Sequence, residues 1–372
     1  MEGKPKIFYV GNYSKGEGYP RANVLLEGLS GVSNLTEIRF PLWDKKDKEK
    51  EIKSPLSLIP SFLKSFLFFL KNSENLKNAD IVIVGFPGYM EIFLFKLIKI
   101  LTGGHYTLVF DYFFSVFESL TMERKVLKPD GFMAKILYFF DKLGLKTADR
   151  VLIDTEPHRD YICSLFNIDK DKFIVLPVGE SEKQFSFIEY PDEKTPFNVL
   201  FFGTFLNLHG IDKIKDAILL LENEEKIKFT LIGKGKNDSI FKESSFQNTK
   251  FVNEFIPPHQ LKTYIKKSHV ILGIFGENDR ANMVIPCKIY DALACGRPVI
   301  TGKTEAVEKS FKNADFVIQC DKKGEAIAKA ILNLYQKDIG ELKKLGKDAY
   351  LFFKENFSPP KIALKLLKEI NK

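Results

Sequence analysis

The chain has 372 residues, of which 45% are hydrophobic and 28% charged, a globular composition that excludes a disordered or fibrous protein. This length suffices for two hydrophobic cores of ordinary domain size. The formal net charge of +8 favours anionic partners, but charges of both signs are interspersed and zinc-finger and RNA-binding motifs are missing, so we expect no nucleic-acid partner.

The cysteines and the N-terminal sequence indicate the cellular compartment in which the protein is expected. Cys163, Cys287, Cys295 and Cys320 form no C-x-x-C pair, which indicates free thiols in a reducing environment. The N-terminus enters an apolar strand without the core of a signal peptide, and no run of about 18 uncharged apolar residues occurs. We therefore expect a cytoplasmic protein.

The chain opens with a strand at 6–10, a glycine-rich loop and a helix at 22–29, the unit that begins a doubly wound sheet. The loop lacks the Lys and Ser/Thr of a P-loop. We expect it to face a ligand, with Arg21 as an anion contact; the alternative places Arg21 in solvent at the helix start. The loop glycines are Gly11, Gly16 and Gly18.

Strands and helices continue to alternate through residues 1–185, the expected first domain. Strands are predicted at 37–42, 79–85, 106–111, 150–154 and 173–177, and helices at 56–70, 92–101, 130–146 and 158–166. Asp111 ends a strand at the carboxyl edge, where ligands collect in parallel sheets. We expect it to recognise a hydroxyl group or act as a base; the alternative is a helix cap.

Two of these helices, 56–70 and 92–101, are strongly apolar and carry Lys64, Lys96 and Lys99. Apolar helices with lysines suit an anionic membrane surface, which would place the protein on the inner face of the membrane. The alternative is a pair of core helices whose lysines extend outward to water.

A polar segment with two prolines, residues 186–196, is typical of an interdomain linker. The α/β pattern then restarts in a second expected domain, residues 197–354. Strands are predicted there at 197–202, 228–233, 250–255, 269–275, 299–301 and 316–319, and helices at 212–221 and 287–295. The C-terminal segment 355–372 is expected to be helical and to pack back on the first domain.

The helix at 287–295 has features of a phosphate site. Pro286 suits the first helical position, and a helix start offers free N–H groups and a positive dipole end. Lys288 lies in the first turn, and Asp291 follows on the same face. Such a face could hold a diphosphate and a ribose diol; the alternative is a packing helix with two solvated charges.

Four patterns follow one another along the chain. They are Ala148-Asp149-Arg-Val-Leu with Leu176-Pro177-Val-Gly179; Phe202-Gly203-Thr204 with His209-Gly210-Ile211; Phe229-Thr-Leu-Ile-Gly233-Lys-Gly235; and Tyr290-Asp291-Ala-Leu-Ala-Cys-Gly296-Arg-Pro298-Val-Ile. Their order and spacing resemble the family 4 glycosyltransferases (glycosyl transferases group 1). The resemblance implies the GT-B fold, an α/β architecture of two facing Rossmann-like domains with a cleft between them.

The resemblance also implies that the second domain binds a nucleotide-sugar donor. The matching donor-binding positions are Gly203, Thr204, Gly233, Pro286, Cys287, Lys288 and Asp291, the last of which binds the ribose hydroxyls. His209 matches a basic residue: protonated, it would stabilise the leaving diphosphate, and neutral, it would donate one hydrogen bond. Asp111, His209 and Lys288 are the expected catalytic residues, and the glycine loop with Arg21 is the expected acceptor-side or phosphate loop.

The chain departs from the family pattern at two positions. Met283 stands where many members have a sugar-binding glutamate, so Glu277 or Asp279 substitutes for it or the sugar is held differently. Phe110 stands where many members have a histidine, so only Asp111 of a His-Asp pair is kept. Residues 169–171 have D-x-D metal spacing but lie in a helix-to-strand loop, where we expect the match to be accidental.

The activity implied is transfer of a sugar from a nucleotide sugar to a glycan or lipid-linked acceptor, with retention, the donor diphosphate helping to deprotonate the acceptor. This mechanism requires neither a metal ion nor a cofactor. Two alternatives stay open: a sugar-nucleotide epimerase of the same fold, and a non-catalytic nucleotide-sugar-binding protein, for which Met283 is the motive.

Overall fold

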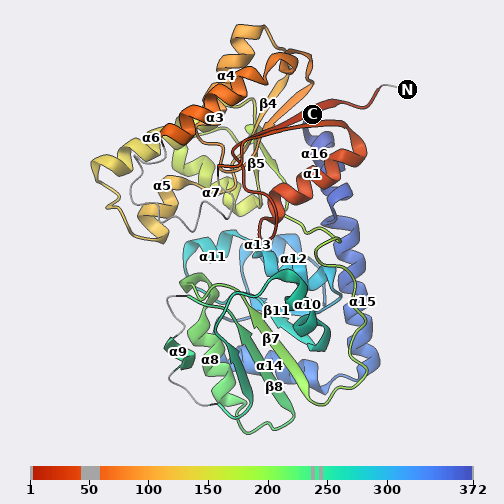
Figure 1. Ribbon diagram of the computed structural model, residues 1–372. Helices are drawn as coiled ribbons and strands as arrows, with labels where there is room; N and C mark the ends of the chain where they lie inside the picture. The colour runs from red at the N-terminus through yellow and green to blue at the C-terminus, as the bar shows by residue number, and fades with distance from the viewer. Residues whose placement is uncertain (1–2, 43–58, 236–238, 243–245, 371–372) are drawn as a thin grey trace. The chain divides into compact units, whose positions relative to one another are not determined.

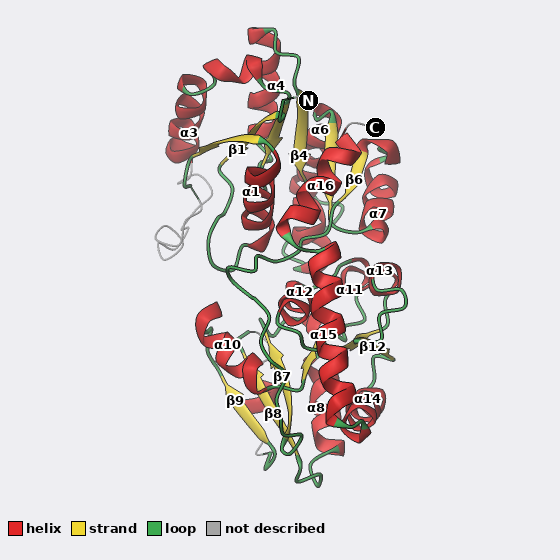
Figure 2. Ribbon diagram, turned by 90° about the vertical axis from the view of Figure 1, so that its right-hand side faces the viewer, coloured by secondary structure: helices red, strands yellow, loops and turns green. Residues whose placement is uncertain are grey.

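The structure is a computed structural model that describes residues 3–42, 59–235, 239–242 and 246–370. The chain divides into two compact units, one of residues 1–177 with 359–372 and one of residues 178–358. Each unit contains a six-stranded sheet whose neighbouring strands are all parallel (Figures 1 and 2). The predicted α/β class with two Rossmann-like sheets is confirmed.

The first unit is a sheet with helices on both faces. Its main elements are β1 (Lys6–Gly11), α1 (Pro20–Val32), β2 (Asn34–Arg39), α3 (Ile59–Lys71), β3 (Ile81–Val84), α4 (Glu91–Thr102), β4 (Thr107–Asp111), α5 (Val116–Glu118), α6 (Phe132–Thr147), β5 (Arg150–Ile153), α7 (Glu156–Phe166), β6 (Phe173–Val175) and α16 (Pro359–Ile370). The strand order is β2-β1-β3-β4-β5-β6. Alternate strand residues pack against α1 and α16 on one face and against α3, α4, α6 and α7 on the other.

The second unit repeats this plan. Its main elements are β7 (Phe197–Phe202), the single turn η5 (Asn207–His209), α8 (Ile211–Leu220), β8 (Ile227–Ile232), α9 (Ser239–Lys242), β9 (Thr249–Val252), α10 (Pro258–Lys267), β10 (Val270–Leu272), α11 (Asp279–Met283), α12 (Cys287–Ala294), β11 (Val299–Gly302), α13 (Glu305–Ser310), β12 (Val317–Cys320), α14 (Gly324–Gln336) and α15 (Ile339–Asn356). The strand order is β12-β11-β10-β7-β8-β9. The sequence patterns did not predict α10 and α14.

The start of one strand and the place of Pro286 at the start of a helix were predicted wrongly. The second strand begins at Asn34 rather than residue 37, because β2 pairs with β1 in a register that sets Asn34 opposite Lys6. The helix α12 begins at Cys287, since Pro286 has an extended ψ of 142° and is the N-cap residue rather than the first helical one. Its carbonyl accepts a hydrogen bond from the N–H of Ile289 at 2.9 Å.

The segment predicted as a linker, residues 186–196, lies inside the second unit. The buried Tyr190 donates a hydrogen bond to the carbonyl of His269 at 2.6 Å, and Arg297 binds the carbonyls of Ile188 and Glu189. The last helix, α16, belongs to the first unit and packs on α1. A Cβ added at Gly28 of α1 would lie 2.1 Å from the Pro359 carbonyl oxygen, so this packing requires glycine.

The two apolar helices predicted at 56–70 and 92–101 are α3 and α4, with residues 56–58 outside the described ranges. Their inner faces lie in the core, where Phe69 contacts Phe95 with ring centroids 5.3 Å apart. Their outer faces stay exposed. None of the helices in the described ranges is both long and apolar enough to cross a membrane.

Candidate functional site

The carboxyl ends of the second unit's parallel strands gather the turns predicted to bind a ligand. The turn after β7 contains Gly203, the turn after β8 contains Gly233, and α12 starts at this edge because it runs back to β11. Gly203 and Gly233 have φ of +143° and +149°, and a Cβ at Gly233 would lie 1.8 Å from the Gly203 carbonyl oxygen. Only glycine allows these two turns to touch.

Three of the predicted site residues converge on one point at this edge. A Cβ added at Gly203 would lie 3.1 Å from Lys288 Nζ and 3.3 Å from His209 Cε1. Lys288 comes from the first turn of α12, and His209 comes from η5. The carbonyl of His209 accepts a hydrogen bond from the Phe275 N–H at 3.1 Å. The structure therefore brings together residues from three segments, as the sequence predicted. Thr204, the next residue, is half-buried beside them.

Lys288 is a buried cation without a hydrogen-bond acceptor among the described residues. Its Nζ lies 3.7 Å from the centroid of the Phe201 ring, which is its main favourable contact. Burial holds the pKa of the Lys288 ammonium well below its usual range, and the nearby Asp291 opposes this shift. The predicted alternative of a solvated charge is wrong for this residue.

His209 is neutral in this environment. Burial lowers the pKa of its imidazole to about 2, and the charge of Lys288 lowers it further in the same direction. Its Nδ1 is buried and has no hydrogen-bond partner within the described part of the chain. A neutral imidazole carries one N–H, so of the two predicted roles the structure favours hydrogen-bond donation.

Asp291 belongs to a carboxyl pair that the sequence reasoning missed. Its pKa is raised well above the usual range, first by burial and then by the charge and hydrogen bond of Glu180; Lys288 opposes the shift. Both side chains are buried, and Glu180 Oε1 accepts a hydrogen bond from the Ser181 N–H at 2.7 Å. Asp291 is therefore buried beside a second carboxyl group and is not a solvated charge either.

The position of the expected glutamate lies in the core. Met283 ends α11 with a buried side chain. Glu277 and Asp279, the predicted substitutes, are exposed, and Glu277 acts electrostatically on Lys213 and Lys322. Asp279 opens α11, where its charge faces the positive end of the helix.

In the first unit, Arg21 and Asp111 bind each other. Arg21 Nε and Nη2 donate to Asp111 Oδ1 at 2.9 and 2.8 Å, and Nη1 donates to the Leu176 carbonyl at 2.7 Å. Both side chains are buried, so the solvated alternative for Arg21 is wrong. The cap alternative for Asp111 is also wrong, because Ser115 caps α5.

The glycine loop after β1 lies at the same edge as Asp111. Gly11 has a φ of +123° and sits against Gly85, whose carbonyl oxygen would lie 3.8 Å from an added Cβ. Gly16 and Gly18 also have positive φ, of +106° and +81°, with open space around them. The side chain of Asn23 holds the loop by bonding both the N–H and the carbonyl of Gly16.

A His-Asp pair does occur in the first unit, one strand beyond the position where relatives carry it. Asp154 follows β5, and its Oδ1 lies 2.6 Å from Nδ1 of His158 in the first turn of α7. Thr155 caps the helix between them. His158 is fully buried, and its Nε2 has no partner among the described residues. The four-residue spacing across a helix start is the sequence signal that could have revealed this pair.

The D-x-D match has a structural role. Asp169 is the N-cap of a short turn and accepts a hydrogen bond from the Asp171 N–H at 3.1 Å. Both residues border the amino end of β6, away from the carboxyl edge that carries Asp111. Over the described residues, no three His, Cys, Asp or Glu side chains are grouped as a metal site would need.

Comparison with solved structures gives the class of fold. Sucrose-phosphate synthase from Thermosynechococcus elongatus has a TM-score of 0.70 at 14% identity, covering 99% of this chain and 98% of that one. HepE from Anabaena, in complex with UDP-glucose, has a TM-score of 0.62 at 11% identity, with 99% of both chains covered. The lipopolysaccharide outer core galactosyltransferase WaaB has 0.63 at 18% identity, covering 98% and 99%. The fold is therefore that of the GT-B proteins.

Sequence comparison finds similarity to glycosyltransferases. Residues 196–337 match the family described as glycosyl transferases group 1. A probable glycosyltransferase, WbjE of Pseudomonas aeruginosa, is 25% identical over 272 residues, or 68% of this chain. The match spans 64% of that relative's length, less than two thirds. The resemblance found in the sequence is confirmed.

Proposed function

We propose that this protein transfers a sugar from a nucleotide-sugar donor to a glycan or lipid-linked acceptor, with retention of configuration. One observation carries the proposal: a buried ammonium without an acceptor, Lys288, meets Gly203 and His209 at the start of α12. An unpaired buried cation costs stability, and an anionic ligand would satisfy it. The first-turn N–H groups of a helix have no intrahelical partner and bind phosphate well.

The donor diphosphate binds at this point in our proposal. Its charged oxygens contact Lys288 and the first turn of α12 around Cys287, and the lack of a side chain at Gly203 leaves room for them. Asp291 receives the ribose hydroxyls. The related HepE binds UDP-glucose, which supports a nucleotide sugar as the ligand class here.

Each of these residues has a defined part in the reaction. The bond between the sugar carbon and the diphosphate oxygen breaks, and charge grows on the leaving oxygen, where Lys288 and the neutral His209 stabilise it. The acceptor hydroxyl attacks from the same face, and its proton passes to the departing phosphate oxygen. Lys288 and the helix amides supply the positive charge, so we propose a reaction without metal ion or cofactor. We assign no step of the reaction to Asp111, which accepts hydrogen bonds from Arg21.

The free cysteines support a reducing compartment, and we propose that the reaction takes place in the cytoplasm at the inner face of the membrane. A lipid-linked acceptor would place the enzyme at that surface.

The test begins with titration of the protein against UDP-, GDP-, ADP- and dTDP-sugars. We expect one nucleotide class to bind and to be released as the diphosphate only when an acceptor is added. Asp291→Ala should abolish binding and transfer, while Asp216→Ala, at an exposed carboxylate of α8 in the same unit, should leave both unchanged. A product formed from donor alone would identify an epimerase, and binding without any product would identify a binding protein. Full activity of Asp291→Ala would refute the site.

A further inference from the structure

Three helices of the first unit form one continuous outer layer. α4 packs between α3 and α6 on the same face of the sheet (Figure 2). Phe69 of α3 contacts Phe95 of α4, and Phe93 of α4 contacts Phe140 of α6, each pair with ring centroids 5.3 Å apart. These contacts hold the helices together from the inside and leave their outer sides to the surroundings.

The outer sides of the three helices are apolar and exposed. On each helix the exposed residues recur at helical spacing, and Leu101 and Phe132 are 71% and 78% exposed. We call this set the apolar surface: Ile59, Leu63, Leu67 and Leu70 of α3; Leu97, Ile100 and Leu101 of α4; and Phe132, Met133, Ile136, Phe139 and Leu143 of α6. Twelve large apolar side chains on one layer far exceed the scattered exposure normal for a monomer.

The charged residues at the surface of these helices are all lysines. α3 carries Lys64 and Lys71, α4 carries Lys96 and Lys99, and α6 carries Lys135, Lys142 and Lys146. The only carboxylates of the three helices, Glu91 and Asp141, are both buried. Asp141 is bonded to Ser115 and to the Phe117 N–H, so neither acid offsets the lysines at the surface.

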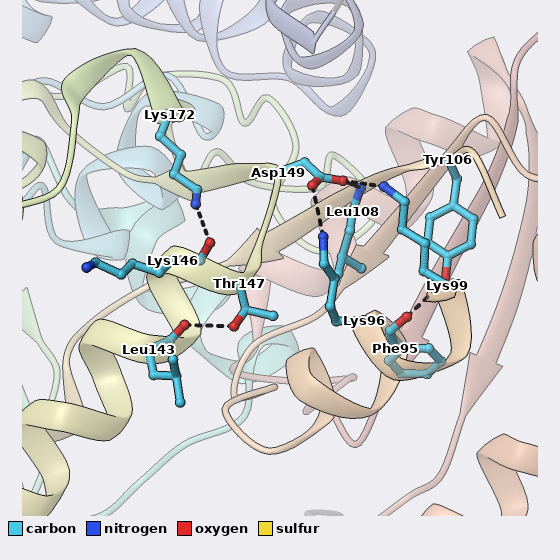
Figure 3. A network of polar contacts seen from close by, with 10 residues as sticks. All are labelled: Phe95, Lys96, Lys99, Tyr106, Leu108, Leu143, Lys146, Thr147, Asp149 and Lys172. Atoms are coloured by element: carbon cyan, nitrogen blue, oxygen red, sulfur yellow. Dashed lines mark hydrogen bonds and ion pairs between the residues drawn. The ribbon is translucent and has the colours of Figure 1, made fainter. Parts of the chain in front are cut away.

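Charges of both signs, with one more cation than carboxylates, lie where α4 and α6 end. A cavity of about 590 Å³ is lined there by four cationic side chains, Lys96, Lys146, Arg150 and Lys172, and three carboxylates. Asp149 accepts from Lys99 at 2.6 Å and from Lys96 at 3.5 Å, and Lys172 donates to the Lys146 carbonyl at 2.7 Å (Figure 3). The Lys146 ammonium points away from this network in Figure 3.

We propose that the apolar surface lies on an anionic lipid bilayer, with its side chains among the acyl chains and the lysines at the lipid phosphates. Exposed apolar residues on helices whose surface charges are all lysines match the interface of an anionic membrane. A second copy of the chain fits poorly, because pairing would bring the same lysines face to face. The inference deepens the proposed function by naming the surface that meets a lipid-linked acceptor, and the binding itself requires no transfer.

Vesicle flotation tests this proposal with the full chain and no nucleotide sugar present. We expect the protein to float with vesicles of phosphatidylcholine and phosphatidylglycerol at low salt, and far less with phosphatidylcholine alone or at high salt. Ile100→Ser and Phe139→Ser should each lower the partition coefficient at least about tenfold. Lys64→Ala with Lys135→Ala should lower it about 20- to 30-fold, since each lysine contributes about fivefold.

Matched controls lie on α16, which covers the opposite face of the same sheet. Leu364→Ser, at a position 52% exposed, and Lys368→Ala should leave flotation unchanged. Circular dichroism and donor affinity like those of the wild type would show that all variants fold, and would keep this inference separate from the proposed function. Equal flotation of surface and control variants, or none at low salt, would overturn it. A wild-type dimer that Phe139→Ser dissociates, without flotation, would assign the surface to a second copy.

Discussion

Replacing Lys288 with methionine tests whether the second unit keeps a buried cation for a ligand. The side chains have similar length, and methionine suits the contact with Phe201. Nζ of Lys288 lies 3.7 Å from that ring and has no hydrogen-bond acceptor among the described residues. We expect Lys288→Met to stabilise the ligand-free protein while it weakens donor binding.

The expected sizes follow from the contacts of the ammonium. A buried donor left without a partner costs about 1–3 kcal/mol, and a cation over an aromatic ring returns about 0.5–2 kcal/mol. Lys288→Met should therefore stabilise the free protein by about 1 kcal/mol, which raises Tm by about 2–4 °C. Loss of one charge-assisted hydrogen bond to the diphosphate, about 1.5–3 kcal/mol, should raise the donor Kd about 10- to 150-fold.

Differential scanning fluorimetry and calorimetric titration with the preferred donor measure the two effects. Lys194→Met is the matched control, because Lys194 lies 5.1 Å from the Tyr335 ring centroid but donates to the Lys337 carbonyl. That variant should lose a little stability and keep the wild-type Kd. A Lys288→Met protein with lower Tm and unchanged Kd would refute the reasoning.

Three other predictions concern groups with shifted pKa. His209→Ala should lower kcat about 10²-fold. The shape of the pH dependence of kcat/KM between pH 5 and 8 should stay that of the wild type, because a pKa of about 2 keeps His209 neutral over this range. Loss of an inflection near neutral pH in the variant would contradict this prediction. Because the pKa of Asp291 is raised in the folded protein, the stability of the wild type should fall as pH rises above about 4. Glu180→Gln removes the neighbouring carboxyl group that contributes to this shift, so the Tm of the variant minus that of the wild type should increase from pH 5 to pH 8. Burial raises the pKa of Glu91 to about 7, so urea denaturation should show the wild type losing about 2–3 kcal/mol over that pH range, and Glu91→Gln should lose none of it.

Much of the fold was readable from the sequence because buried parallel strands leave a strong local signal. β3 is Ile-Val-Ile-Val, buried on both faces, and turn residues mark where it stops. The bounds of β2 were misplaced because this edge strand is half exposed and its register depends on β1, which local pattern does not encode. Residues 186–196 resembled a linker for a similar reason: the contacts that hold them come from Arg297 and His269, far along the chain.

The site was predictable only where one segment carries its chemistry. Lys288 and Asp291 share a helix face, so their proximity followed from helical spacing. Glu180 and Asp291 are far apart in the sequence and interact through tertiary packing, so the sequence around Gly179 does not predict their pairing. Likewise, the buried ion pair of Arg21 with Asp111 joins the start of α1 to the end of β4, and the sequence, which predicted a separate role for each residue, did not reveal that they pair.

Arg297 and Lys288 show how a structural cation differs from one kept for a ligand. Both are buried, one just beyond the end of α12 and the other in its first turn. Arg297 makes six hydrogen bonds, all to backbone carbonyls, and so ties 188–189 and 265–266 to the helix end. Lys288 has a ring beneath it and no acceptor in the described part of the chain. Since burying an unpaired ammonium is costly, and the fold satisfies Arg297 fully, packing alone does not account for Lys288. The anionic ligand that we propose at the start of α12 would supply an acceptor for this amino group.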